Sequence, residues 1–350
     1  MKKREVWLDV LRVLAAFLVI VNHTNSDVFQ SVTPANGTWW LSIAWYALCK
    51  VAVPVFVMIS GSVLLGRVDT RERSIMRLAR TLGALLVFSY LYFLHDTWVN
   101  YGLWPRALRW DLFMFKVWEM EIADSFWYLY FYFGLMIVLP VLQRLACALT
   151  DQEARWMTGA VLGLGAGWPM LVHFMPTLSS PAVSLLTQIC TMLGLFFAGW
   201  QLRKMAKPLH GLPWLLGLIA SVLLSVTLLH AEYVRMEGAG KYWAFMDNRM
   251  QPSLPVVIGA ICLFLFIRCL FDRPLGERTQ RLWIELGGCS FGIYLLQQWV
   301  IAQTEVRLFI PLCNTLTAFP AVVVWEIAVF VLCLAAAMLL RRIPGIKKIV

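Results

Sequence analysis

Three side chains in the first apolar segment have the chemistry of a functional site and are costly in a membrane. Asp9, Arg12 and His23 lie within one apolar run, where a charge near the centre of a span costs about 2.5–3.5 kcal/mol on insertion scales. Arg12 and His23 are eleven residues apart, so on a helix they are about 20° apart around the axis and about 16 Å apart along it. One helix face therefore presents a guanidinium, which suits phosphate, and an imidazole, which titrates near neutral pH.

The remainder of the chain must supply the helices that position this face. Its 350 residues are 60% hydrophobic and 14% charged, and the mean hydropathy is +0.72. With repeated apolar runs of about 20 residues, these values are typical of polytopic helical membrane proteins. We expect an all-α integral membrane protein that forms one domain over residues 1–350, with no separate soluble domain. The ten expected spans are 6–24, 46–66, 82–98, 127–146, 156–174, 182–202, 212–230, 255–271, 282–303 and 319–340.

The distribution of basic residues predicts the topology. With the N-terminus inside, 21 of the 30 Lys and Arg residues fall in cytoplasmic segments and eight in outer segments. This bias supports ten spans with both termini cytoplasmic. It also accounts for the net charge of +10 without a nucleic-acid partner. The first apolar run lacks a small-residue cleavage site, so we expect it to stay in the membrane.

The eight cysteines are scattered through apolar runs without metal-ligand spacing. We therefore expect small core residues and no metal site or disulfide. Aromatic residues are frequent in the outer segments 99–126 and 231–254. They favour an interfacial belt, with a stacking platform for a sugar as the alternative. No soluble domain or coiled coil indicates an oligomeric state.

Five stretches, in chain order and in matching spans, carry a resemblance to a known family. They are Trp7 to Arg12 with ten residues between Arg12 and His23; Val53 to Gly61; Arg73, Arg77 and Arg80; Phe126 to Leu129 leading to Leu139 and Pro140; and Ser290 to Leu296. Together they resemble integral-membrane acyltransferase family 3, close to the branch that O-acetylates bacterial surface polysaccharides and enterobacterial common antigen. Gln297 stands where the family often has His. Gln forms hydrogen bonds but cannot carry a proton.

The resemblance implies a bacterial inner-membrane enzyme that moves an acyl group, in particular acetyl, from cytoplasmic acetyl-CoA to a hydroxyl of a surface glycan or lipid-linked sugar. His23 is then the general base, with Asp27 one turn further on to orient it or to bind substrate. A central cavity or channel would carry the donor from the cytoplasm, and Ser60 and Gly61 would allow close backbone approach or a helix break that lines it. The cofactor-binding candidates are Arg12, Arg73, Arg77, Arg80 and Ser60, and the remaining substrate-binding candidates are Trp127, Tyr128, Tyr294 and Gln297. Arg12 and Asp9 are grouped with His23 as catalytic candidates, and Asp9 would pair with Arg12 and lower the cost of burying it.

Each of these roles has a plainer alternative. Arg73, Arg77 and Arg80 would serve equally as a positive-inside anchor at anionic lipid headgroups. Arg12 and Asp9 would form a purely structural ion pair. A second function class is a proton-coupled transporter that uses Asp9, Arg12 and His23 as a polar relay, although the chain shows none of the half-to-half similarity common in such proteins. A third is a membrane subunit that binds a partner, for which the basic loops offer no motif.

Overall fold

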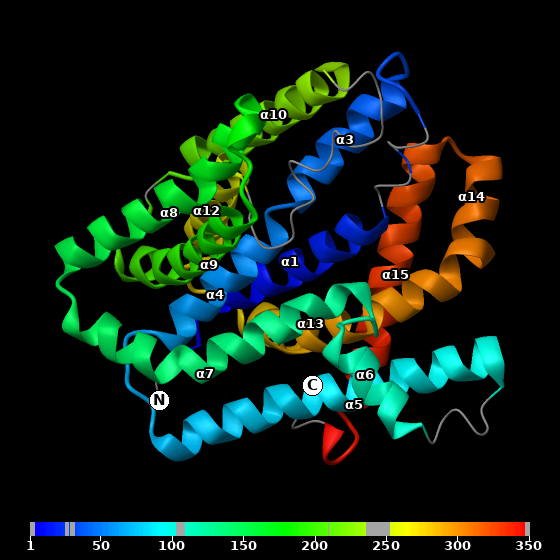
Figure 1. Cartoon of the computed structure of the whole chain (residues 1–350), viewed down its shortest axis with the longest axis horizontal. Coiled ribbons are helices and arrows are strands. Elements are labelled where there is room, and N and C mark those ends of the chain that lie inside the picture. The colour runs from blue at the N-terminus through cyan, green and yellow to red at the C-terminus, as the bar shows by residue number, and fades with distance from the viewer. Residues whose placement is uncertain are drawn as a thin grey trace.

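The computed structural model describes residues 4–24, 28, 32–102, 109–208, 210–235 and 253–346, and over these residues the chain is helical, without strands. Helices stack across the molecule in Figure 1, with α5 and α7 along one edge and α1 and α4 between them and the α8, α9, α10 and α12 group. The α-helices are α1 (Val6–Thr24), α3 (Gly37–Cys49), α4 (Ala52–Leu64), α5 (Arg71–Tyr101), α6 (Trp110–Trp118), α7 (Trp127–Ala148), α8 (Asp151–Phe174), α9 (Pro181–Lys204), α10 (Leu212–Arg235), α12 (Leu254–Phe271), α13 (Glu277–Thr304), α14 (Ile310–Thr315) and α15 (Ala318–Leu340). Short 3-10 turns, η2 (Asp124–Phe126) and η3 (Pro176–Leu178), precede α7 and α9, and a π-helical turn, η4 (Glu305–Phe309), follows α13.

The all-α membrane fold is confirmed. Nine segments of the described chain are long and apolar enough to cross a membrane: 6–24, 37–64, 71–100, 124–148, 151–174, 181–204, 212–234, 254–271 and 318–340. The remaining predicted span, 282–303, lies within α13, whose 28 residues are about 42 Å long. Charged residues in its first turns, such as Arg278, Arg281 and Glu285, and the glutamines at 297, 298 and 303 near its end lower the hydropathy of α13.

Two spans differ from their predicted limits. The second begins at Gly37 and not at residue 46, and it consists of α3 and α4 joined at Lys50 and Val51. Pro54 lies in the first turn of α4, where its missing N–H is tolerated, so a new helix begins just before it. The third span is one continuous helix from Arg71, which carries the basic segment and the apolar segment on the same axis.

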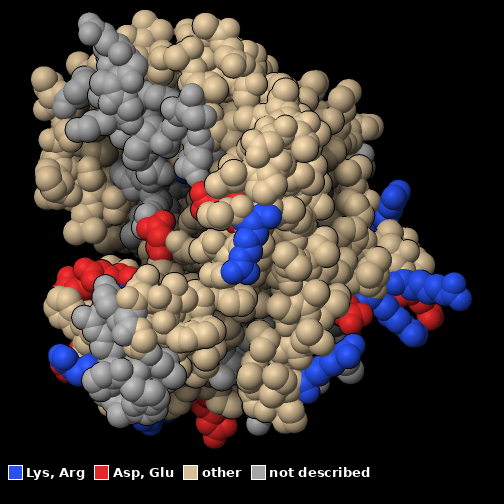
Figure 2. Space-filling model, turned by 90° about the vertical axis from the view of Figure 1, so that its right-hand side faces the viewer, with Lys and Arg blue, Asp and Glu red and all other residues tan. Residues whose placement is uncertain are grey.

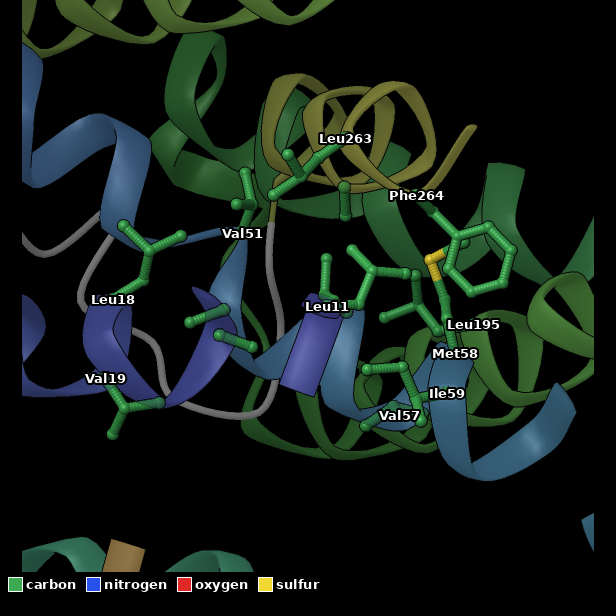
Figure 3. Close-up of a cluster of buried hydrophobic side chains, with 14 of the residues drawn as sticks. Leu11, Leu18, Val19, Val51, Val57, Met58, Ile59, Leu195, Leu263 and Phe264 are labelled. Carbon is green, nitrogen blue, oxygen red and sulfur yellow. The ribbon is translucent and has the colours of Figure 1, made fainter. Parts of the chain in front are cut away.

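The first helix lies at the centre of the packing. α1 contacts α3, α4, α12, α13 and α15. Figure 3 shows Leu11 of α1 beside Met58 of α4, Leu195 of α9 and Phe264 of α12, and all four side chains are at most 2% exposed. Burial of aliphatic and aromatic groups on several sides fixes the rotation of α1, and this rotation decides which of its faces remains for the site.

Helices α4 and α9 approach each other so closely that side chains are excluded at the contact. A Cβ on Gly61 would lie 1.7 Å from the carbonyl oxygen of Phe196, and a Cβ on Gly199 would lie 1.9 Å from that of Met58. Small residues permit this kind of backbone approach between membrane helices. The expected close approach at Gly61 is therefore present and is directed toward α9, while α4 remains unbroken through Gly61.

Candidate active site

A cavity of about 930 Å³ lies between α1, α4 and α13 on one side and α5 and α7 on the other. Arg12 and His23 both line it, which confirms that the two side chains share a face of α1. Since α1 has 19 residues and is about 28 Å long, the cavity follows most of the length of one span. Its two ends differ in chemistry, and we call them the arginine end and the histidine end.

The arginine end is defined by five guanidinium groups that line the cavity: Arg4, Arg12, Arg77, Arg80 and Arg341. No carboxylate of the described residues lines this end. Asp9 lies behind it with its side chain 0% exposed, accepting hydrogen bonds from Arg4 at 2.9 and 2.8 Å and from Arg12 at 2.7 Å. The expected pair between Asp9 and Arg12 is thus present, and Arg4 is a second partner that the sequence analysis did not identify.

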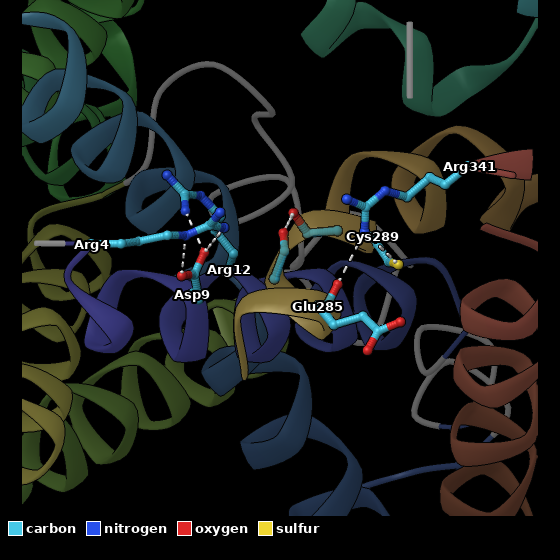
Figure 4. Close-up of polar contacts among 8 residues, drawn as sticks. Arg4, Asp9, Arg12, Glu285, Cys289 and Arg341 are labelled. Atoms are coloured by element: carbon cyan, nitrogen blue, oxygen red, sulfur yellow. Dashed lines mark hydrogen bonds and ion pairs between the residues drawn. The ribbon is translucent and has the colours of Figure 1, made fainter. Parts of the chain in front are cut away.

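Helix α13 makes room for this carboxylate. A Cβ on Gly287 would lie 2.6 Å from the Cβ of Asp9, so a larger residue there would push α1 away from α13. A glycine at this position therefore lets Asp9 sit between the helices and hold two arginines toward the cavity (Figure 4).

Arg77 is held by a second buried carboxylate. Its Nη1 lies 2.5 Å from Asp69 Oδ2, and the amide of Gln143 on α7 donates to Asp69 and to the carbonyl of Leu64, both at 2.9 Å. Burial raises the pKa of Asp69, but the Gln143 hydrogen bond and the charges of Arg77, Arg67 and Arg73 outweigh it, and the net pKa is lowered. This network joins the ends of α4 and α7 to the start of α5.

The predicted cofactor residues separate into two groups. Arg12, Ser60, Arg77 and Arg80 line the cavity, whereas Arg73 is exposed on the first turn of α5 and is outside the lining. The Ser60 hydroxyl donates to the Phe56 carbonyl at 2.9 Å, so its oxygen can still accept hydrogen bonds.

The histidine end carries a different set of polar groups: Asn22, His23, Lys50, Asp124, Ser125 and Gln298. Figure 2 views the side toward which the C-terminal end of α1 points in Figure 1, and Asp and Glu side chains gather there beside a recess. Lys50 occupies the break between α3 and α4 inside the second span. Its ammonium lies 4.2 Å from the ring centroid of Tyr46. Asp27 lies outside the described residues.

Aromatic rings also line the cavity, and they include the predicted Trp127, Tyr128 and Tyr294. The Tyr294 hydroxyl donates to the carbonyl of Ser125 at 2.6 Å, and the Ser125 N–H donates to Gln298 Oε1 at 2.8 Å. These bonds fasten η2 to α13 at the histidine end.

Gln297 is fully buried and is not among the cavity-lining residues. Its amide nitrogen and oxygen have no hydrogen-bond partner among the described residues. The neighbouring Gln298, about 100° around the helix, faces the cavity instead.

Glu326 of α15 is a buried carboxylate that the sequence analysis missed. It is 0% exposed and accepts hydrogen bonds from the Thr24 hydroxyl and the Trp45 indole, both at 2.9 Å. It therefore anchors the residue that follows His23 to α3 and α15. A lone acidic residue inside a span as apolar as 318–340 is a signal in the sequence, and it would have identified this position.

Within the described residues, no group of three His, Cys, Asp or Glu side chains is arranged to hold a metal ion. Residues 5–342 match one family model, described as an acyltransferase domain. No curated protein and no solved structure matches the chain. The family match extends over nearly the whole sequence and includes every helix that lines the cavity.

Proposed function

The chain belongs to integral-membrane acyltransferase family 3, and from this premise we propose that it transfers an acyl group, acetyl in the first instance, from a coenzyme A thioester to a hydroxyl of a surface glycan or lipid-linked sugar. The observation that carries the proposal is one cavity with guanidinium groups at one end and an imidazole at the other. Such a cavity can hold a phosphate-bearing donor and still leave room for an acceptor beside the base.

The arginine end fits the phosphates of coenzyme A. Guanidinium groups bind phosphate through paired N–H donors, and Arg12, Arg77 and Arg80 line the cavity without a carboxylate lining beside them among the described residues. Asp9 and Asp69 lie behind and offset part of the charge, so a positive excess remains for a ligand. When bound, the thioester supplies an acyl carbon already activated for attack.

At the histidine end the chain would activate the acceptor. A hydroxyl is a weak nucleophile, and His23 would take up its proton on a ring nitrogen as general base while the oxygen bonds to the acyl carbon. As the carbon–sulfur bond breaks, His23 would return the proton to the departing coenzyme A thiolate. Lys50 lines the same end and would stabilise negative charge that develops during transfer. Asn22, Asp124 and Gln298 offer donors and acceptors to the other hydroxyl groups of a sugar.

The aromatic lining supports a sugar acceptor. Tyr128 stands 5.9 Å from Tyr294 and 6.0 Å from Trp127, ring centroid to centroid, so these residues form a cluster with the apolar faces on which sugar rings stack. Trp127 and Tyr128 line the cavity at the start of α7. We assign them to acceptor binding.

The charge bias supports an orientation. The arginine end belongs to the side that is rich in Lys and Arg, which the positive-inside rule places in the cytoplasm, where coenzyme A thioesters are found. The histidine end then faces the periplasm of a bacterial inner membrane. The transporter alternative is weaker, because Asp9 is committed to Arg4 and Arg12 and is not open to a transported proton or substrate.

The test measures acetyl-CoA binding by calorimetry and acyl transfer by product formation, both on detergent-purified protein. Arg12→Ala is expected to weaken binding at least tenfold, since charge-assisted hydrogen bonds contribute about 1.5–3 kcal/mol. His23→Ala is expected to bind the donor within twofold of wild type and to lose transfer by about 10²- to 10⁴-fold.

His210→Ala is the matched control, because His210 is exposed between α9 and α10 and is not in the cavity lining. Folded wild-type protein that does not bind acetyl-CoA would refute the proposed donor. Full transfer activity in His23→Ala would remove the proposed base.

A further inference from the structure

Arg341 reaches the cavity from the opposite end of the sequence. It follows the last residue of α15 and extends to α13, where its Nη1 donates to the carbonyl of Glu285 at 3.2 Å and lies 3.4 Å from the Cys289 sulfur. In Figure 4 its guanidinium lies beside Glu285 and Cys289 of α13, while Arg4, Asp9 and Arg12 form a separate group on the other side of the view. Among the described residues, no carboxylate lies within ion-pair distance of Arg341, in contrast to Arg4 and Arg12.

A glycine on α13 holds this guanidinium in place. A Cβ on Gly288 would lie 2.6 Å from Arg341 Nη1, 2.9 Å from Nη2 and 3.0 Å from Cζ, so the group rests against the bare backbone. The preceding Gly287 admits Asp9 in the same manner. Adjacent glycines thus bring the charged groups of both chain ends to one turn of α13.

We propose that Arg341 is a phosphate-binding residue of the donor site, held against Gly288 so that its free N–H groups face the cavity. The inference rests on the proposed function, because it names a residue for the same donor. Two contacts already hold the guanidinium against α13. Less conformational entropy is therefore lost when its remaining N–H donors bind a phosphate.

The charge at this end supports a ligand with several phosphates. Arg12 and Arg77 each face a buried carboxylate, while Arg341 and Arg80 have no ion pair to a described residue and both line the cavity. Coenzyme A carries a diphosphate and a 3′-phosphate, and the latter alone has about 1.5–2 negative charges near neutral pH. Arg341 therefore adds a positive charge that no carboxylate of the described residues neutralises.

The experiment compares coenzyme A and dephospho-coenzyme A by calorimetry in detergent, for wild type, Arg341→Gln and Arg342→Gln. Arg342 is the neighbouring residue with the same charge, but it is exposed and is not in the cavity lining. We expect Arg341→Gln to weaken coenzyme A binding at least tenfold and to flatten its salt dependence. Arg342→Gln should remain within twofold of wild type. A smaller loss for dephospho-coenzyme A would assign the contact to the 3′-phosphate, and an equal loss would assign it to the diphosphate.

A second variant tests the part played by the glycine. Gly288→Ala places a methyl group against the guanidinium, so it should weaken coenzyme A binding in an otherwise wild-type chain and have no further effect in Arg341→Gln.

If wild type binds and Arg341→Gln binds equally well, the inference is wrong and the proposed function stands. If Arg341→Gln alters only the retention of anionic lipid, Arg341 is a headgroup anchor and the inference is again wrong. If folded wild type does not bind coenzyme A, the proposed function fails and the inference fails with it.

Discussion

Individual charged residues in this protein are held by partners that lie behind the cavity wall. Asp9 orients Arg4 and Arg12, Asp69 orients Arg77, and Gly288 accommodates Arg341. Each arrangement leaves N–H donors directed at the cavity while the opposite side of the group is neutralised or packed. Preorganisation of this kind reduces the cost of ordering long side chains when an anion binds.

Asp69 should make the fold sensitive to acid. Its pKa is lowered in the folded protein, so folding favours the ionised carboxylate. The stabilisation is complete above the unfolded pKa, about 3.8, and is lost as the pH falls below that value toward the folded pKa. We expect the thermal unfolding midpoint of the purified protein to fall more steeply below pH 4 in wild type than in Asp69→Asn.

At neutral pH the Asp69→Asn variant should be less stable by about 1–3 kcal/mol, because Gln143 and Arg77 lose a charged acceptor. Asp111→Asn is the control. A hydrogen bond from Arg109 lowers the pKa of Asp111 to about 2, but both side chains are exposed and the pair is screened by solvent. Identical acid profiles for wild type and Asp69→Asn would contradict the assignment.

Among the structural elements, helices α4 and α9 leave the least room for a side chain where they meet. Gly61→Ala would place a methyl group 1.7 Å from the Phe196 carbonyl oxygen, and backbone cannot move aside as a flexible side chain does. Overpacking typically costs about 1–3 kcal/mol and occasionally more. We therefore expect a clear drop in the thermal unfolding midpoint, with loss of donor binding as α4 shifts the Ser60 side of the cavity.

Gly134→Ala on α7 is the matched control for this change. No atom lies within 4 Å of a Cβ at that position, and alanine has the higher helix propensity. Its midpoint should equal or exceed that of wild type. An unaltered midpoint in Gly61→Ala would show that α4 and α9 can separate freely.

The features of the fold and the site that could be predicted from the sequence are those that depend on a single helix. Apolar runs identified the spans, and the eleven-residue spacing identified the shared face of Arg12 and His23, because both depend on one helix. The third span was predicted to begin at residue 82, too late by eleven positions, because helix hydrogen bonding continues through charged residues. The break between α3 and α4 was not predicted, since a charged Lys50 inside a span requires a cavity to face.

Contacts between distant helices were not predictable from one sequence. Thr24 and Glu326 are 302 positions apart, and their meeting depends on how α1 and α15 pack. A single step along α13 likewise separates the buried Gln297 from the cavity-lining Gln298. The phase of α13 is set by Gly287 against Asp9 and by the Tyr294 bond to Ser125, both of which are tertiary contacts.

For the whole molecule, the contacts place both ends of the described chain beside the arginine end. Arg4 binds Asp9 next to Gly287, Arg341 rests on Gly288, and Arg203 at the end of α9 pairs with Glu5 at 2.9 Å. A cavity that begins there and follows α1 to His23 should be reachable from opposite faces of the membrane at its two ends. Donor and acceptor would then enter from different compartments.

Thiol labelling in sealed vesicles tests this arrangement. Val63→Cys and Asp124→Cys, each in a chain whose eight natural cysteines are replaced by Ala, place one thiol in the cavity lining near the arginine end and one at the histidine end. A membrane-impermeant reagent should label Asp124→Cys from one side and Val63→Cys from the other, and acetyl-CoA should protect Val63→Cys. His210→Cys, on the connection after α9, should follow Val63→Cys and report orientation. Labelling of both cavity positions from the same side would mean that the cavity opens to one compartment, and the acceptor would then have to meet His23 from the cytoplasm.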